Sequence, residues 1–352
     1  LYLDYRTVIE DAILLIKDGR VVSAGLDVTI PEGAIIRDLK GKYVYPSFID
    51  AYTNYGLPAT ERSGRTGGYS MGNPPQVTAT YQTAFTWNEA IRPYFHSSDE
   101  FAADEKAAAP MRKQGFGVVL TFKPDGIARG TSALVSLASE PASKVLLDDR
   151  AAAHYSFEKG SSRQNYPGYL MGTIALIRQT YYDVDWYRAQ TRKKYTDLSL
   201  DAWTENQTLP QIFEVRDKLS LLRADKIGDE FEVQYILKTA GDEYQLLEEV
   251  KKTNAPLIVP INFPHAGKVQ NPYQANLVPL EDLKHWEMAP ANLAFLQNEN
   301  ITFAITTNGL KDVSSFLKNL RKAVQYGLSK ETALKALTDT PASLLKASDQ
   351  LG

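Results

Sequence analysis

The chain has 352 residues, a formal net charge of −3, no cysteine and only four histidines, and 43% of its residues are hydrophobic. This apolar content suffices for a large folded core and excludes a largely disordered chain. The absence of cysteine excludes disulfides, thiolate metal ligands and cysteine nucleophiles. The mixed, slightly acidic charge gives no reason to expect a nucleic-acid partner, and no apolar run is long enough to predict a membrane span.

The first part of the chain predicts short antiparallel strands. Residues 12–17 and 20–25 flank an Asp-Gly dipeptide, which is typical of hairpin turns. A second tight turn separates two further predicted strands, at residues 35–39 and 43–46. We therefore expect this region to be a small all-β unit.

From residue 46 onward, short apolar segments alternate with amphipathic segments, which is the pattern of repeated β–α units. Strands are predicted at residues 48–51, 118–122, 145–147, 211–215, 233–237, 257–261 and 303–306. Helices are predicted at residues 99–113, 218–230, 242–253, 280–284, 291–298, 313–326 and 330–337. This alternation over about 300 residues favours an α/β fold of the (β/α)8 TIM-barrel type. A doubly wound open sheet is the alternative, although no Gly-x-Gly-x-x-Gly follows a predicted strand.

Two regions interrupt this alternation. Residues 57–93 are rich in Gly, Pro, Ser, Thr and Asn and predict a long loop after the first barrel strand. Residues 155–210 form an insert with many Tyr and Trp residues, in which residues 169–192 predict a helical lid. The alternative is that these aromatic residues only dock the insert on the barrel.

Residues 41–54 read GKYVYPSFIDAYTN, which resembles the entry to the barrel in the amidohydrolase superfamily. In that family a hairpin ending in Gly-Lys-x-Val-x-Pro-Gly-Phe-Ile-Asp leads into an Ala-His-x-His metal motif on the first strand. Residues 14–25 resemble the small β-sandwich that accompanies such barrels, and residues 327–342 resemble the last helices of imidazolonepropionase-like members. The resemblance implies a barrel over residues 46–352 and, over residues 1–45, an incomplete sandwich that residues beyond the C-terminus complete.

The resemblance also implies hydrolysis by water that one or two divalent metals, zinc in relatives, activate at the carboxyl ends of the strands. In this sequence the positions that match the metal ligands and the catalytic aspartate hold Tyr52, Asn54, Glu214, Thr239 and Asn308. Phenol and amide groups are poor substitutes for imidazole, and the amide of Asn308 cannot accept a proton as a general base. Since a metal site needs three or more convergent ligands, we expect no metal and no other cofactor.

Three residues remain as candidates for chemistry without metal: Glu214, His154 and Asp50. A buried Glu214 with a raised pKa would act as a general base. His154 would need an orienting carboxylate such as Asp148 or Asp149, and its alternative is a hydrogen-bonded loop residue. For Asp50 the resemblance implies a mainly structural role.

The remaining polar features have ordinary explanations. His96, His265 and His285 are expected at loop or surface positions. Residues 126–131 contain two glycines but lack the Gly-Lys-Ser/Thr ending of a phosphate-binding loop, so they predict a turn.

These observations favour an amidohydrolase-like domain with a lost metal site, acting as a non-catalytic structural or regulatory module of a larger hydrolase. The expected partner is an active amidohydrolase domain in the same polypeptide, and a homo-oligomer stays open. One alternative is a hydrolase of amide or cyclic amide bonds with a remodelled site, and another is a module that binds peptide or sugar at the barrel mouth. No targeting signal is visible in the given chain, and an envelope, periplasmic or secreted location stays open.

Overall fold

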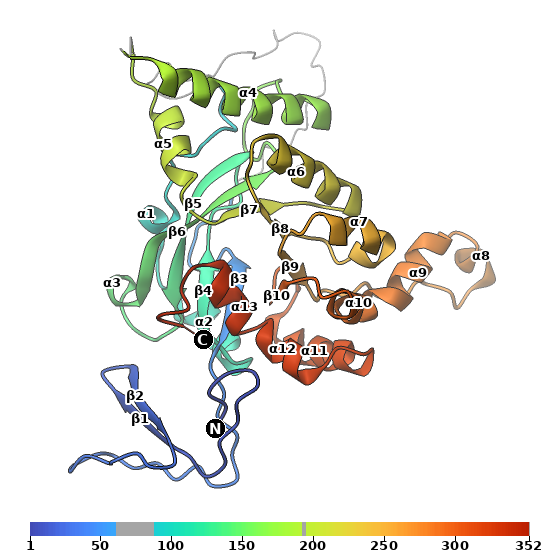
Figure 1. Cartoon of the computed structure of the whole chain (residues 1–352). Helices are drawn as coiled ribbons and strands as arrows, with labels where there is room; N and C mark the ends of the chain where they lie inside the picture. The colour runs from blue at the N-terminus through green and yellow to red at the C-terminus, as the bar shows by residue number, and fades with distance from the viewer. Residues whose placement is uncertain (61–87, 192–194, 352) are drawn as a thin grey trace.

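The computed structural model describes residues 1–60, 88–191 and 195–351 of the chain (Figure 1). Eight strands form one sheet in the order β10-β9-β8-β7-β6-β5-β4-β3, and its edge strands β3 and β10 lie against each other, so the sheet is a nearly closed barrel. These strands are β3 (Phe48–Thr53), β4 (Phe116–Thr121), β5 (Ala128–Ser136), β6 (Leu146–Ser156), β7 (Gln211–Glu214), β8 (Ile236–Lys238), β9 (Leu257–Pro260) and β10 (Phe303–Thr306). The predicted α/β barrel is confirmed in this outline.

One strand departs from the predicted (β/α)8 pattern. β5 runs antiparallel to β4 and β6, whereas the other neighbouring strands in the sheet pair in parallel. The prediction of a turn at residues 126–131 was therefore wrong from Ala128 onward. Hydrogen bonds to β6 keep these residues extended, although the segment contains glycine. The predicted strand at 145–147 contains only the start of β6, which continues to Ser156 because β5 and β7 supply hydrogen-bonding partners.

Helices and 3-10 turns lie between most of the successive strands of this sheet and cover its outer side (Figure 1). Their bounds are α1 (Ser97–Glu100), α2 (Glu105–Lys113), α3 (Ala142–Val145), α4 (Leu170–Ala189), α5 (Leu198–Asn206), α6 (Lys218–Glu230), α7 (Leu247–Lys252), α8 (Pro272–Ala275), α9 (Leu280–Met288), α10 (Asn292–Asn298), α11 (Phe316–Gln325), α12 (Lys330–Lys335) and α13 (Asp339–Leu344), with 3-10 turns η1 (Glu243–Leu246), η2 (Ala289–Ala291) and η3 (Val313–Ser315). The helix predicted at 99–113 is divided into α1 and α2, since Asp104 caps the second one through the Lys106 amide. None of the helices in the described part of the chain combines the length and apolar character needed to cross a bilayer.

Local sequence explains the best-predicted helix, α6. Asp217 accepts a hydrogen bond of 2.7 Å from the Ser220 amide and so caps the first turn. Leu221, Ala224 and Ile227 recur on one face of the helix, and all three are buried. The predicted bounds and the observed bounds of this helix agree, because the cap and the apolar face are both local in sequence.

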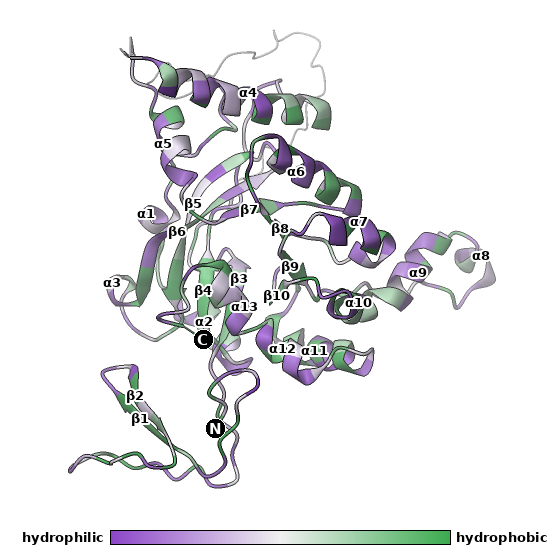
Figure 2. Ribbon diagram, in the orientation of Figure 1, coloured by the Kyte–Doolittle hydropathy of each residue, from purple (hydrophilic) through white to green (hydrophobic). Residues whose placement is uncertain are grey.

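Apolar side chains fill the barrel and the space between the barrel and its helices. Figure 2 shows hydrophobic residues along β4, β6 and β9. Ile49, Leu120 and Ile258 belong to the cluster inside the barrel, and Ala342 of α13 packs with them near the amino ends of the strands. The interior is therefore apolar at that end, and its polar residues gather at the carboxyl end.

The insert at residues 155–210 forms α4 and α5, and the predicted helix ends at Ala189 rather than at 192. Tyr181 of α4 stacks on Phe231 at 4.3 Å between ring centroids, and its hydroxyl lies 2.6 Å from that of Tyr235. Trp203 of α5 is fully buried against Tyr181. These rings dock the insert on the barrel, in agreement with the alternative interpretation of its aromatic residues. Most of the predicted loop 57–93, namely residues 61–87, lies outside the described residues.

The N-terminal hairpin extends away from the barrel (Figure 1), whereas Arg6, nearer the N-terminus, forms an ion pair of 2.6 Å with Glu331 of α12. β1 (Ile13–Lys17) and β2 (Arg20–Gly25) form an antiparallel pair, as the sequence predicted. The strands predicted at 35–39 and 43–46 are absent from this described segment, and Ile35 is 92% exposed. A two-stranded hairpin without a covered apolar face is marginally stable, which explains the difference. The predicted sandwich is therefore not confirmed, and the domain boundary at residue 45 stays a prediction.

Candidate functional site

Five polar side chains converge at the carboxyl end of the barrel, which is the end where β/α barrels carry their active sites. Tyr52 comes from β3, Arg129 from β5, His154 from β6, Glu214 from β7 and Lys238 from β8. Arg129 reaches this end because β5 runs antiparallel and therefore begins here. We call these five residues the cationic centre, since they combine two cations with one carboxylate.

Glu214 connects the members of the cationic centre. Its carboxylate accepts a hydrogen bond of 2.6 Å from Nη1 of Arg129, and its other oxygen lies 3.6 Å from Nζ of Lys238. The same Nη1 lies 3.2 Å from the Tyr52 hydroxyl, and the Lys238 ammonium lies 5.3 Å from the centre of the Tyr52 ring. The side chains of Arg129 and Lys238 are only 4% and 10% exposed. The two cations are therefore held inside the barrel wall.

Burial and charge together determine the pKa values at this centre. Burial by itself raises the pKa of Glu214, but Arg129 and Lys238 outweigh it and lower that pKa to about 2. This is opposite to the raised pKa that the alternative of a metal-free hydrolase requires of Glu214 as a general base. Burial lowers the pKa of Lys238, with Glu214 opposing the shift, and burial raises the pKa of Tyr52 well above its usual range.

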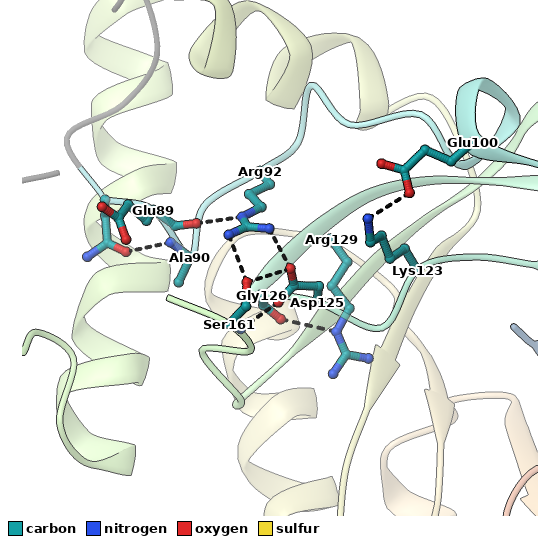
Figure 3. Close-up of polar contacts among 10 residues, drawn as sticks. Glu89, Ala90, Arg92, Glu100, Lys123, Asp125, Gly126, Arg129 and Ser161 are labelled. Atoms are coloured by element: carbon teal, nitrogen blue, oxygen red, sulfur yellow. Dashed lines mark hydrogen bonds and ion pairs between the residues drawn. The ribbon is translucent and has the colours of Figure 1, made fainter. Parts of the chain in front are cut away.

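A close backbone contact positions Arg129. Its Nε donates to the carbonyl oxygen of Gly126 at 3.1 Å (Figure 3). Gly130 follows with a φ of +76°, and a Cβ atom there would lie 1.9 Å from the Phe95 carbonyl oxygen, so this position requires glycine. Figure 3 also shows the ion pair of 2.5 Å between Arg92 and Asp125, which ties the incoming segment to the start of β5.

His154 lies within β6 and is only 1% exposed. Its ring stacks on Phe122 at 3.9 Å between centroids, with an angle of 6° between the ring planes. Neither ring nitrogen has a hydrogen-bond partner among the described residues. The expectation of a hydrogen-bonded loop histidine was therefore wrong, and neither Asp148 nor Asp149 supplies the orienting carboxylate that His154 would need as a general base. Burial, and then the charge of Arg129, lower the pKa of His154 well below its usual range, so the imidazole is neutral.

Asp50 occupies a different environment, between the two edge strands. One carboxylate oxygen accepts from Oγ1 of Thr306 at 2.6 Å and from the Tyr52 amide at 3.1 Å. The other accepts from the amide and the hydroxyl of Thr307, at 2.9 and 2.6 Å. We call Asp50, Thr306 and Thr307 the β3–β10 seam. The three hydrogen bonds from Thr306 and Thr307 join the first and last strands of the barrel, and together with the bond from Tyr52 they use both oxygens of Asp50.

The other predicted positions are more scattered. Asn54 and Asn308 line a depression of about 440 Å³ beside Tyr52, at the ends of β3 and β10. Thr239 is buried, and its hydroxyl lies 3.4 Å from the Ile258 carbonyl oxygen. The structure thus brings together Tyr52 and Glu214 from the predicted ligand positions, whereas Thr239 faces the barrel wall.

The three other histidines lie outside this centre. His96 precedes α1 and contacts the Thr131 hydroxyl at 2.9 Å, and His285 of α9 stacks on Tyr244. His265 is exposed in the segment after β9, which agrees with the predicted loop position. None of these three contacts a member of the cationic centre.

Comparison with solved structures identifies the fold. An amidohydrolase from Thermotoga maritima MSB8 matches with a TM-score of 0.72 and 21% identity, over 96% of this chain and 85% of that one. The chain has the amidohydrolase fold. A second amidohydrolase structure matches with a TM-score of 0.50 and 11% identity, over 99% of this chain and 86% of that one. No protein-family model and no curated protein sequence matches the chain.

The resemblance to the amidohydrolase superfamily seen in the sequence is confirmed at the level of the fold. At these identities the likeness concerns the fold alone, so the site has to be judged from its own residues. In the described ranges 1–60, 88–191 and 195–351, no three His, Asp or Glu side chains are grouped so as to hold a metal ion.

The residues at the metal position of the amidohydrolase fold do not fit a divalent metal. Glu214 offers a carboxylate, but one oxygen already binds Arg129 and the other faces Lys238. Two fixed positive charges within 4 Å of that carboxylate would repel a divalent cation that approached it. The imidazole of His154 is the remaining nitrogen ligand nearby, and one carboxylate with one imidazole falls short of a usual ligand set.

Sequence reasoning missed Arg129 and Lys238, the two cations of this amidohydrolase-like barrel. Arg129 lay in a segment interpreted as a turn, and Lys238 directly precedes Thr239, the position that drew attention instead. A signal existed for both, because a charged residue at the end of an apolar strand is rarely buried without a partner. That Arg129 and Lys238 both contact Glu214 could not be predicted, because it depends on the order of the strands in the sheet.

Proposed function

We propose that this chain is an amidohydrolase-like domain that uses no metal and catalyses no hydrolysis, and that it serves as a structural or regulatory module of a larger hydrolase. The observation that carries the proposal is the double ion contact of Glu214, with Arg129 at 2.6 Å and Lys238 at 3.6 Å. The single carboxylate among the matching ligand positions is thereby neutralised by side chains of the chain itself. A side-chain cation compensates the carboxylate without offering a site for activated water.

The acid–base properties of the centre support the absence of catalysis. A general base works best when its pKa is near the operating pH. The pKa of Glu214 is about 2, because its two cationic neighbours outweigh the effect of burial. His154 has no carboxylate partner among the described residues, and Asn308 carries an amide where the family uses an aspartate. These properties favour a non-catalytic module over the alternative of a remodelled hydrolase.

The exposed N-terminal segment supports the role as a module. Val21, Val22, Ile35, Ile36 and Tyr43 all have more than half of their surface exposed, with Tyr43 at 74%. A segment with several exposed large apolar side chains suits contact with another protein unit. The partner that we propose is an active amidohydrolase domain in the same polypeptide.

Metal content and turnover test the absence of a catalytic metal. The purified chain is incubated with zinc, separated from free metal by gel filtration and analysed by mass spectrometry for bound zinc. We expect far less than one zinc per chain, and no turnover of amides, cyclic amides or dipeptides above a heat-denatured sample. One zinc per chain, or turnover that Glu214→Gln abolishes, would overturn the proposal.

A matched pair of variants tests whether the charges of Arg129 and Lys238 are the reason that the site binds no zinc. Tyr52→His with Asn54→His restores the family motif but keeps both cations, and we expect zinc uptake to stay far below one per chain. Adding Arg129→Met and Lys238→Met to that variant removes the repulsion and is expected to raise zinc uptake. If the first variant already binds one zinc, the two cations are not what excludes the metal.

A further inference from the structure

We propose that two copies of this chain form a dimer in which residues 269–288 of each copy lie on α11 of the other. We call residues 269–288, which contain α8 and α9, the arm. This dimer is independent of the proposed function, because its two surfaces lie outside both the cationic centre and the N-terminal hairpin. Three features support it: the arm buries none of its helical residues, it exposes large apolar side chains, and its charge is opposite to that of α11.

The helices of the arm have no apolar face packed on the barrel. Neither α8 nor α9, both described in full, contains a buried residue. Two polar contacts connect α9 to the rest of the chain: His285 lies 3.2 Å from the Tyr244 hydroxyl, and Glu281 lies 4.0 Å from Lys218. Helices this short are marginally stable in water unless they pack on another surface. We therefore infer that a second surface covers the arm.

Large apolar side chains are exposed along the arm. Tyr273, Leu277 and Leu280 are 84%, 82% and 79% exposed, and Val269 and Trp286 are 48% and 41% exposed. Exposed apolar residues that are scattered singly are ordinary, but several within one short segment suit contact with another protein. Figure 1 shows α8 and α9 projecting away from the barrel, so a partner can reach these side chains.

The exposed charges of α9 are mainly negative. Glu281 and Asp282 lie in its first turn and Glu287 lies near its end, and all three are exposed. Lys284 is the one lysine or arginine in this helix. A surface with positive charge therefore complements α9, because opposite charges across an interface favour association in the correct orientation.

The outer face of α11 carries that positive charge. Lys318, Arg321 and Lys322 are three or four residues apart and therefore lie on one side of the helix, which contains no carboxylate. In the described part of the chain none of the three forms an ion pair, and Lys322 instead lies 5.8 Å from the ring centres of Phe263 and Tyr326. Tyr326, directly after α11, is 46% exposed and adds an apolar contact. Cations beside an exposed aromatic ring match the acidic and apolar arm.

A second copy of this chain provides both surfaces at once. In Figure 1, α8, α9 and α11 all lie on the right-hand side of the barrel. A two-fold axis would therefore place each arm on α11 of the other copy, so that the same contact forms twice. An unrelated protein would need two separate complementary surfaces to do the same, which is why we choose a second copy as the occupant.

Light scattering coupled to size-exclusion chromatography measures the mass of the chain in solution. We expect a dimer at micromolar concentration, which dissociates as the sample is diluted. A chain that stays monomeric throughout the micromolar range overturns the proposal, and so does an assembly larger than a dimer.

Apolar variants test the arm. Leu277→Asp with Leu280→Asp is expected to weaken association about a hundredfold, because it places charge in the contact. Both side chains are highly exposed, so the change removes no buried contact within one copy. Val21→Asp with Val22→Asp, at the exposed hairpin, is the matched control and should leave the dimer unchanged. Dissociation by the hairpin variant together with a dimeric arm variant would overturn the proposal.

Charge reversal tests the contact between the arm and α11. Asp282→Lys with Glu287→Lys makes one variant, and Lys318→Glu with Arg321→Glu makes the other. Each variant alone repels its own copies at both contacts, so we expect monomers. Mixed in equal amounts, they should form a heterodimer, because one contact is then unchanged and the other has both charges reversed. Variants that both stay dimeric alone, or a mixture that stays monomeric, would show that the arm does not lie on α11.

Discussion

The barrel buries polar groups in two places, and the two places are built differently. At the β3–β10 seam, the four hydrogen bonds of Asp50 use both of its carboxylate oxygens. In the cationic centre, two cations share one carboxylate, and His154 has no partner among the described residues. Because each unsatisfied buried group costs about 1–3 kcal/mol, the seam stabilises the closed barrel whereas the centre destabilises it.

This difference separates structural polar groups from functional ones. The carboxylate of Asp50 has all its hydrogen bonds within the protein, and joining β3 to β10 is a sufficient reason for its burial. Partly satisfied cations and an orphaned imidazole need another explanation, and local violations of good packing are typical of functional sites. Removing a partner from a satisfied group should therefore destabilise the chain in either region, whereas replacing the unpartnered His154 should stabilise it.

The largest effect is expected for Arg129→Met in the cationic centre. This change leaves Glu214 and Tyr52 without their main partner, and breaking such a buried pair costs about 3 kcal/mol. Urea denaturation followed by circular dichroism measures the free energy of unfolding. Arg6→Met, which breaks the exposed pair with Glu331, is the control and should leave the free energy of unfolding nearly unchanged. Equal losses in the two variants would mean that Arg129 is not held as described.

Asp50→Asn is expected to have the next largest effect. The new amide group would place donors against the donors of Thr307, so two hydrogen bonds are lost and unfolding becomes easier by about 2 kcal/mol. The same urea titration measures the change, with the exposed Asp27→Asn as control. An unchanged unfolding free energy would remove the seam as the link between the first and last strands.

His154→Phe should stabilise the chain, whereas the two preceding variants should destabilise it. A phenyl ring keeps the stacking on Phe122 and removes the unpartnered nitrogens, so the unfolding free energy should rise by about 1 kcal/mol. The control is His285→Phe, in which the ring loses its contact with the Tyr244 hydroxyl and gains no stability. A destabilised His154→Phe chain would show that the imidazole has a partner in solution.

The smallest effect is expected outside both regions, at Asp225 on α6. Burial, and then the charge of Asp229, raise the pKa of Asp225 to about 6. A carboxyl group with a raised pKa is least favourable when ionised, so stability should increase as the pH falls from about 6 towards the unfolded value near 4. After allowance for solvent screening, Asp225→Asn should stabilise the chain at pH 7 by about 0.5 kcal/mol and have no effect at pH 4. Thermal melts at the two pH values measure this difference, and a larger gain at pH 4 would contradict the sign.

Much of the fold could be predicted from local signals. The cap and apolar face of α6, the Asp-Gly turn between β1 and β2, and the apolar strand at Leu257–Pro260 are each encoded within a few residues. The first half of β5 could not be predicted in this way, because Gly130 and the preceding Gly126 indicate a turn, whereas pairing with β6 keeps the segment extended from Ala128 onward. The absent second hairpin has the same cause, since its apolar residues have no sheet to cover them.

The candidate site shows the same division. The sequence by itself determined that the positions matching metal ligands hold Tyr52, Asn54, Thr239 and Asn308 and that Glu214 is the carboxylate left among them. Only the tertiary structure decided what surrounds Glu214, since Arg129 lies 85 residues away in the chain and forms the contact through the antiparallel strand. Residue types are read one position at a time, whereas the pKa of a carboxylate and the charge of a site depend on groups that only strand order brings within a few ångströms.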